Sequence, residues 1–234
     1  MKETAVLIKM KQFDRFISQI GKESFEKLIN KKVMIFGIGG VGGYVAESLA
    51  RSGIQNFVLI DSDIVEETNI NRQIVATLNT IGESKVKVMK DRILSINKNA
   101  NVEIIQKFYL PENSGEFDFS GVDYIVDCVD TVSAKLSIVS KAIELNIPVI
   151  SAMGAGNKMD PTKLEVSDIF KTSVDPLCKV MRRELKKSGI NKLKVVYSKE
   201  EPIKNNSRVP TSNAFVPPTM GLIITSEVIK DLIK

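Results

Sequence analysis

The chain has 234 residues, of which 43% are hydrophobic and 26% are charged, as in ordinary soluble enzymes. This length can bury a full core and predicts one domain with elaborations rather than two equal domains. No apolar run approaches the roughly 18 residues that a membrane span needs, and the first residues lack the features of a secretory signal. We therefore expect a cytoplasmic protein with no membrane segment. The net charge of +5 indicates a polyanionic partner only weakly.

Histidine is absent, and the only cysteines are Cys128 and Cys178. Without imidazole there can be no histidine-activated serine or cysteine nucleophile and no histidine-based zinc site. Two cysteines cannot build a disulfide framework or a four-thiolate zinc site, so we expect no zinc. Catalysis must therefore depend on phosphate binding, carboxylates, lysine, arginine and backbone dipoles.

Short apolar runs alternate with amphipathic stretches up to about residue 150. One or two helices are expected over residues 11–30. Strands are predicted at 33–36, 57–60, 102–105, 124–126 and 149–150, with helices at 41–52, 84–97 and 132–145. This alternation predicts an α/β fold with a doubly wound, mostly parallel Rossmann-like sheet of order 3-2-1-4-5. Ligands of such sheets bind at the switch point between the first and fourth strands.

The whole of 1–234 is expected to be a single domain, with a helical segment at 1–30, a nucleotide-binding core at 31–150 and an irregular elaboration at 151–234. Within the elaboration, strands are expected at 164–169 and 193–197, around a basic helix at 177–188. Residues 204–218 are rich in Asn, Ser and Pro and predict a flexible loop. The stretch 220–234 places Met220, Ile224, Val228 and Leu232 on one face of a helix.

The clearest local signal is a glycine-rich loop between the first strand and the first following helix. Gly37, Gly39, Gly40 and Gly42 form a Gly-x-Gly-x-x-Gly pattern in the required strand–turn–helix context. Free N–H groups and the helix dipole favour a phosphate there. Asp61, at the end of the second strand, can accept hydrogen bonds from ribose hydroxyls. The pattern serves both NAD and ATP enzymes, and a ligand-free glycine turn is the alternative.

The polar run after Asp61 favours ATP over NAD. It contains Asp63, Asn69, Asn71, Arg72 and Gln73, followed by Lys85 at the start of the next helix. Attack of a carboxylate on the α-phosphorus of ATP builds charge on phosphoryl oxygens, which Arg72 and Lys85 can stabilise while Asn69 and Asn71 orient phosphate or ribose. The alternative is that Arg72 and Lys85 are solvated surface charges.

Two aspartates follow the fourth predicted strand, at the end of the sheet that faces the predicted phosphate loop. They are Asp127 and Asp130, and Thr131 follows them. Asp130 can hold Mg²⁺ against ATP phosphates. It can also cap the helix that follows, and the two roles are compatible.

At these residues the chain resembles the ubiquitin-activating-enzyme-like (ThiF-type) adenylating superfamily. The resemblance implies ATP contacts for Gly40, Asp61, Asn69, Arg72 and Lys85, and a magnesium-linked role for Asp130. Arg15 matches an arginine that reaches the phosphates of the partner subunit, which implies a homodimer. Branches that activate sulfur carriers usually hold zinc between two Cys-x-x-Cys pairs, and this chain has neither pair.

The segments around Ser151–Asp160, Asp168–Thr172 and Asp175–Leu185 are similar to a branch that dehydrates threonylcarbamoyladenosine in tRNA. That resemblance covers about residues 13–202 and implies tRNA as substrate, ATP as co-substrate and an adenylated threonyl carboxylate as intermediate. Residues 204–234 lack the cysteine that some members carry, so a cysteine-dependent step or sulfur-relay partner has no support. An activator of a ubiquitin-like sulfur carrier and an NAD-dependent oxidoreductase are the competing interpretations.

The predicted helix at 177–188 carries cationic side chains at spacings of three and four. They are Lys179, Arg182, Arg183, Lys186 and Lys187, and they could lie along tRNA phosphates. A solvated helix face is the alternative.

Overall fold

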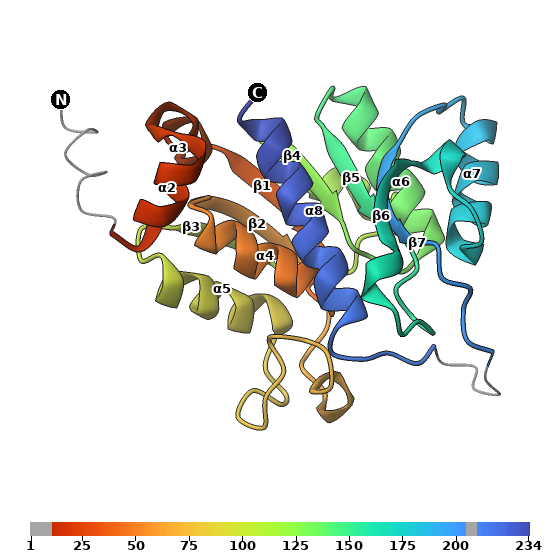
Figure 1. Cartoon of the computed structure of the whole chain (residues 1–234), viewed down its shortest axis with the longest axis horizontal. Helices are drawn as coiled ribbons and strands as arrows, with labels where there is room; N and C mark the ends of the chain where they lie inside the picture. Colours follow the sequence, from red (N-terminus) through yellow and green to blue (C-terminus); the bar gives the residue numbers. More distant parts are fainter. Residues whose placement is uncertain (1–10, 205–209) are drawn as a thin grey trace.

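The computed structural model describes residues 11–204 and 210–234 of the chain. At its centre is a seven-stranded sheet with the order β3-β2-β1-β4-β5-β7-β6 (Figure 1). The strands are β1 (Lys32–Phe36), β2 (Asn56–Ile60), β3 (Asn101–Ile105), β4 (Tyr124–Asp127), β5 (Val149–Ala152), β6 (Leu164–Asp168) and β7 (Lys194–Ser198). Neighbouring strands run parallel except β6, which pairs antiparallel with β7 at the edge. The predicted α/β class and the order 3-2-1-4-5 are confirmed, and β7 and β6 extend the sheet.

Helices precede the sheet and connect its strands. They are α2 (Asp14–Ile20), α3 (Lys22–Ile29), α4 (Gly42–Arg51), α5 (Lys85–Ile96), α6 (Val132–Glu144), α7 (Pro176–Lys187) and α8 (Val216–Leu232). Short 3₁₀ turns lie at η1 (Lys11–Phe13), η2 (Glu67–Asn69), η3 (Pro111–Glu116), η4 (Pro161–Lys163) and η5 (Ile169–Lys171). The expected N-terminal helical segment is divided at Gly21, whose φ of 85° suits glycine and ends α2.

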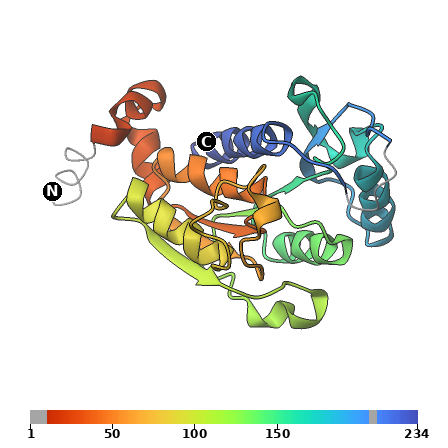
Figure 2. The ribbon, with the colours of Figure 1, turned by 90° about the horizontal axis from the view of Figure 1, so that it is seen from below.

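Alternating side chains of the central strands build a core on each face of the sheet. Val33 and Ile35 of β1 pack with α4, α5 and α8, whereas Met34 and Phe36 pack with α6 and the segment after β3. Figure 2 shows α4 and α8 on one side of the sheet and α6 on the other. Because central parallel strands are covered on both faces, only their ends reach solvent.

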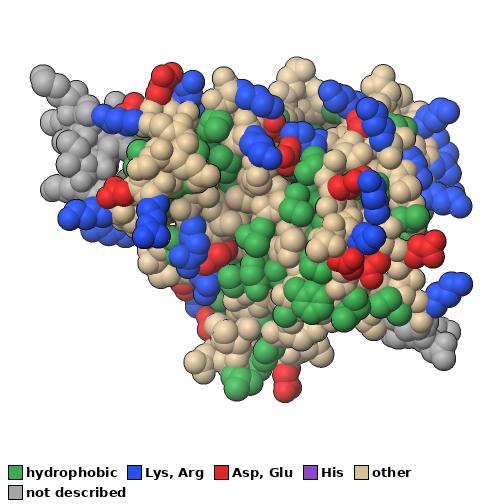
Figure 3. Space-filling view, viewed as in Figure 1, with side chains coloured by type: hydrophobic (Ala, Val, Ile, Leu, Met, Phe, Trp, Pro, Cys, Tyr) green, Lys and Arg blue, Asp and Glu red, His purple; other side chains and the backbone are tan. Residues whose placement is uncertain are grey.

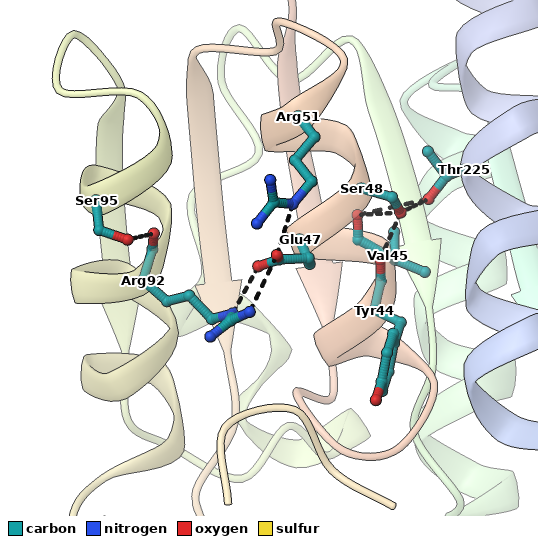
Figure 4. Close-up of polar contacts among 8 residues, drawn as sticks. All are labelled: Tyr44, Val45, Glu47, Ser48, Arg51, Arg92, Ser95 and Thr225. Carbon is teal, nitrogen blue, oxygen red and sulfur yellow. Dashed lines mark hydrogen bonds and ion pairs between the residues drawn. The ribbon is translucent and has the colours of Figure 1, made fainter. Parts of the chain in front are cut away.

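Helix α4 is held between α5 and α8 by polar contacts (Figure 4). The buried carboxylate of Glu47 accepts hydrogen bonds from Arg51 (2.7 Å) and, through both oxygens, from Arg92 of α5 (2.6 and 3.1 Å). On the other side, the hydroxyl groups of Ser48 and Thr225 lie 2.6 Å apart. These contacts fix α4, whose first turn follows the glycine loop.

The prediction for the C-terminal helix was wrong at its start. Helix α8 begins at Val216, inside the predicted loop 204–218, because Pro217 and Pro218 occupy its first turn, where no N–H donor is required. Residues 205–209 of the predicted loop lie outside the described residues. Met220, Ile224 and Val228 are fully buried, as the helical periodicity predicts, whereas Leu232 is partly exposed. Within 11–204 and 210–234, no helix is long and apolar enough to cross a membrane.

Candidate active site

A cavity of about 980 Å³ opens at the carboxyl ends of β1, β2, β4 and β5. It lies at the switch point of the sheet, where doubly wound folds bind ligands. Most residues predicted to contact ATP line it: Gly37, Gly39, Gly40, Asp61, Asp63, Asn69, Arg72, Gln73, Lys85, Asp130 and Thr131. Gly42, Asn71 and Asp127 do not. The tertiary structure therefore brings together three segments that are far apart in the sequence.

The glycine loop is shaped by backbone contacts that exclude side chains. Gly37 has a φ of 85°, and a Cβ on it would lie 2.7 Å from the carbonyl oxygen of Cys128. A Cβ on Gly42 would overlap the carbonyl oxygen of Gly37. Gly42 therefore allows α4 to pack closely on the loop, which explains why it does not itself face the cavity. Gly39 and Gly40 leave the backbone open to an approaching phosphate.

Asp61 is fixed by the backbone around it. Its carboxylate accepts hydrogen bonds from the N–H groups of Ile38 (2.6 Å) and Asp63 (2.9 Å). Burial raises the pKa of Asp61 above its ordinary value, although these donors and the charge of Lys85 act in the opposite direction. The carboxylate thus ties the glycine loop to the end of β2 and faces the cavity as a hydrogen-bond acceptor.

Lys85 lies at the start of α5, as the sequence predicts, and it is buried. Only 5% of the residue is exposed, and its ammonium group donates to Asp63 at 2.8 Å. Partial burial opposes ionisation of Asp63, but the hydrogen bond and charge of Lys85 outweigh it, so the pKa of Asp63 lies below its usual range. The alternative that Lys85 is a solvated surface charge is excluded by its burial.

The segment between β2 and α5 presents the remaining polar groups. Arg72 donates to the Thr68 carbonyl at 3.0 Å and to the Asn71 side chain at 2.9 Å. Asn71 in turn donates to the carbonyl of Ser212 at 3.1 Å, so it braces a cavity wall. Gln73 is buried, and its side-chain oxygen has no hydrogen-bond partner among the described residues. An unsatisfied buried acceptor on a cavity wall suits a ligand donor.

The two aspartates after β4 have different environments. Asp130 is exposed and lines the cavity, whereas Asp127 is completely buried against Lys135 and Ser151. The predicted ATP contact of Asp127 therefore has no support, because its carboxylate is occupied beneath the cavity floor. Thr131, not Asp130, is the N-cap residue of α6, which leaves Asp130 free of the alternative capping role.

The sequence model of the ThiF family matches residues 13–233. The chain belongs to the ThiF family. It is 42% identical over 241 residues to a Bacillus subtilis protein named tRNA threonylcarbamoyladenosine dehydratase, with 95% of each chain covered. The crystal structure of Escherichia coli tRNA N6-threonylcarbamoyladenosine dehydratase with ATP superposes with a TM-score of 0.90 at 32% identity, covering 95% of this chain and 93% of the other. An adenylyltransferase and sulfurtransferase of Saccharomyces cerevisiae is 33% identical over 144 residues, which cover 61% of this chain and 32% of that protein.

Some residues that line this ThiF-family cavity were not predicted from the sequence. Phe108 is 51% exposed and follows β3, whose end lies beside that of β2. Its place after a strand could have indicated it. On the opposite side, Met153–Gly156, Leu177 and the strap 210–212 complete the wall. Residues 210–212 are distant in the sequence from these other residues, and only the tertiary fold brings them to the cavity.

The surroundings of both cysteines disfavour the thiolate form. Burial raises the pKa of the Cys128 thiol far above its ordinary range and that of Cys178 to about 12. Among the residues that the structure describes, no group of three or more carboxylate or thiol side chains could hold a metal ion. A protein-only metal cage is therefore absent from this part of the chain.

The basic helix forms where it was predicted, and of its five cations only Arg182 is partly buried, against a residue outside the helix. Arg182 is half-buried and donates to the backbone carbonyl of Thr172 at 3.1 Å and to its hydroxyl group, so its guanidinium stabilises the start of α7. Lys179, Arg183, Lys186 and Lys187 are exposed. Figure 3 shows Lys and Arg side chains along the edge of the molecule that α7 occupies in Figure 1. Arg15, on α2, is exposed and does not line the cavity of its own chain.

Proposed function

We propose that this protein is an ATP-dependent tRNA threonylcarbamoyladenosine dehydratase. The observation that carries the proposal is the similarity to the Bacillus subtilis dehydratase over 95% of both chains, together with a cavity lined by most of the residues predicted to contact ATP. The likeness to the adenylyltransferase and sulfurtransferase covers far less of either chain. The chain also lacks the cysteine pairs expected of a sulfur-carrier activator.

The reaction consists of two displacements. The threonyl carboxylate attacks the α-phosphorus of ATP, a new P–O bond forms, and pyrophosphate leaves. The neighbouring carbamoyl oxygen then attacks the activated carbonyl carbon, AMP leaves, and the carbamoyl nitrogen loses a proton to give a five-membered ring. The second step is intramolecular, so proximity supplies most of its acceleration and no histidine base is needed.

The cavity suggests how ATP lies. Asp61 and Phe108 occupy one end, where a carboxylate can accept from ribose and an aromatic ring can stack on adenine. The glycine loop, Arg72 and Lys85 surround the middle, where the phosphates and their developing charge fit. The opposite end, beside Gly154 and Leu177, is left for the threonylcarbamoyl group.

Magnesium fits this arrangement as an ion shared with ATP. Mg²⁺ commonly uses one or two carboxylates together with substrate phosphates rather than a complete protein cage. Asp130 supplies such a carboxylate at the cavity. When bound, Mg²⁺ neutralises phosphate charge.

We further propose that the enzyme acts as a cytoplasmic homodimer that holds tRNA with α7. Arg15 cannot serve its own cavity in this geometry, which supports a role in the cavity of the partner subunit. Leu177, in the first turn of α7, lines the cavity, and the exposed cations of the helix lie farther along it. Phosphates of a tRNA whose modified base enters the cavity can therefore contact this helix.

The deciding experiment is mass spectrometry of nucleosides from tRNA carrying threonylcarbamoyladenosine after incubation with enzyme, ATP and Mg²⁺. We expect the modified nucleoside to lose the mass of one water, with AMP and pyrophosphate released in equal amounts. Lys85→Met removes the buried ammonium from the phosphate region and should abolish the loss, whereas Lys27→Met on distant α3 should not. An unchanged nucleoside, with protein that is folded and binds ATP, would exclude the dehydratase function. Adenylation of a carrier protein instead would establish the sulfur-carrier alternative.

A further inference from the structure

Lys135 is a charged residue buried in the core of the molecule. It lies in the second turn of α6, and its side chain has no exposed surface. Its ammonium group donates to the Asp127 carboxylate (3.0 Å), the Ser151 hydroxyl group (3.2 Å) and the Ala152 carbonyl (2.7 Å). A lysine ammonium has three N–H donors, so all three are used.

These contacts join the ends of two neighbouring strands. Asp127 is the last residue of β4 and pairs with Ser151 of β5, whose hydroxyl group donates to the same carboxylate. The second carboxylate oxygen of Asp127 accepts from the backbone N–H of Val129 at 3.2 Å. Lys135 therefore fixes the chain where it leaves both strands.

Each strand leads directly into a wall of the cavity. After β4 come Val129, Asp130 and Thr131, and after β5 come Met153 and Gly154. One wall carries the carboxylate suited to the phosphates, and the other borders the space left for the threonylcarbamoyl group. The separation of the two walls thus depends on the ammonium group beneath them.

Stability alone does not explain this arrangement. A buried ion pair loses so much hydration that an apolar pair of similar volume is often equally stable. A contribution to geometry does explain it, because three directional hydrogen bonds fix position in a way that apolar packing does not. Misplacement of reacting groups by about 1 Å can lower a rate on the order of a hundredfold.

We propose that Lys135 is a positioning residue for the adenylation step, holding Asp130 and the Met153–Gly154 segment at the spacing that the two substrates require. This inference rests on the proposed function. The side chain does not touch ATP or tRNA; it acts through Asp127 and Ala152.

The test replaces the whole ion pair, because removal of one partner leaves an unpaired buried charge that can prevent folding. The variant is Lys135→Met with Asp127→Leu. Its matched control is Lys31→Met with Asp123→Leu, which removes an ion pair at the amino ends of β1 and β4, the edge of the sheet opposite the cavity. Circular dichroism and thermal unfolding establish folding. Steady-state kinetics then give kcat and the KM for ATP separately.

We expect the Lys135 variant to fold and to bind ATP nearly as the wild type does, with kcat reduced about tenfold or more. The control should keep the wild-type kcat despite any loss of thermal stability. A folded Lys135 variant with wild-type kcat overturns the proposal. If the double variant does not fold, Ser151→Ala decides, since it breaks the shared hydroxyl contact without changing charge. A reduced kcat at unchanged Tm then supports the positioning role, and an unchanged kcat overturns it. Failure of the proposed function is distinct, because the wild type itself would then not dehydrate the nucleoside.

Discussion

The exposed cations of α7 provide the sharpest quantitative test of the proposed tRNA surface. The change is Lys179→Gln, Arg183→Gln and Lys186→Gln in one protein. Arg182 is left intact because its guanidinium holds Thr172 and its loss would disturb the helix start. The control is Lys22→Gln, Lys27→Gln and Lys230→Gln, which removes the same charge from exposed side chains of α3 and α8.

The expected change in the salt dependence of tRNA binding follows from the release of counterions. Each phosphate contact contributes about 0.9 to the slope of log affinity against log salt concentration, so three contacts contribute about 2.7. Through these three contacts, the affinity of the wild type for tRNA should fall roughly 40-fold between about 50 and 200 mM salt. The variant lacks the contacts, so this part of its salt dependence should be missing. Arg183 also pairs with Glu184 at 2.6 Å, which makes this value an upper bound.

Fluorescence anisotropy with labelled tRNA at several salt concentrations measures the slope. The α7 variant should bind weakly with a flatter salt dependence, while its thermal shift with ATP stays at the wild-type value. The α3 and α8 control should keep nearly the wild-type slope. Equal slopes for the α7 variant and the wild type would refute the reasoning and mean that α7 is a solvated face.

Three further outcomes follow from the structure. Arg15→Ala and Arg72→Ala should each abolish turnover, and mixing the two proteins should restore part of it; no recovery despite proven subunit exchange would contradict a shared site. Phe108→Ala should raise the KM for ATP about tenfold through loss of base stacking, with kcat largely kept, and an unchanged KM would argue against adenine at that end of the cavity. Partial burial alone would raise the pKa of Asp231, but hydrogen bonds from Lys194, Lys234 and Tyr124, with the charge of Lys194, lower it to about 2, so the unfolded chain binds the proton more readily. Urea unfolding of Asp231→Asn should therefore show a loss of about 2 kcal/mol above about pH 4 that disappears as the pH falls toward 2, and a pH-independent loss would contradict this.

Much of the site could be predicted because its residues lie in short motifs next to strand ends. The glycine loop, Asp61 and Lys85 each follow a strand or open a helix, and parallel strands bring their carboxyl ends to one edge. The same periodicity predicted the sheet order. The local sequence pattern was sufficient to predict a site residue wherever its position at a strand end or helix start also determines that it lies at the cavity.

Other features depend on partners that are distant in the sequence. No local pattern separates Asp127, which is buried beneath the cavity, from Asp130, which lines it, because the difference comes from Lys135 and Ser151. Arg182 belongs to the cationic stripe by spacing alone, yet Thr172 occupies its guanidinium.

The sequence by itself therefore determined the fold class and the chemistry of this protein, since strand periodicity and the phosphate-binding loop are local properties. Only the tertiary structure decided which charged groups remain available to a ligand. Burial and hydrogen bonding between segments far apart in the chain control the availability of a charge, and neither is encoded by spacing within one segment.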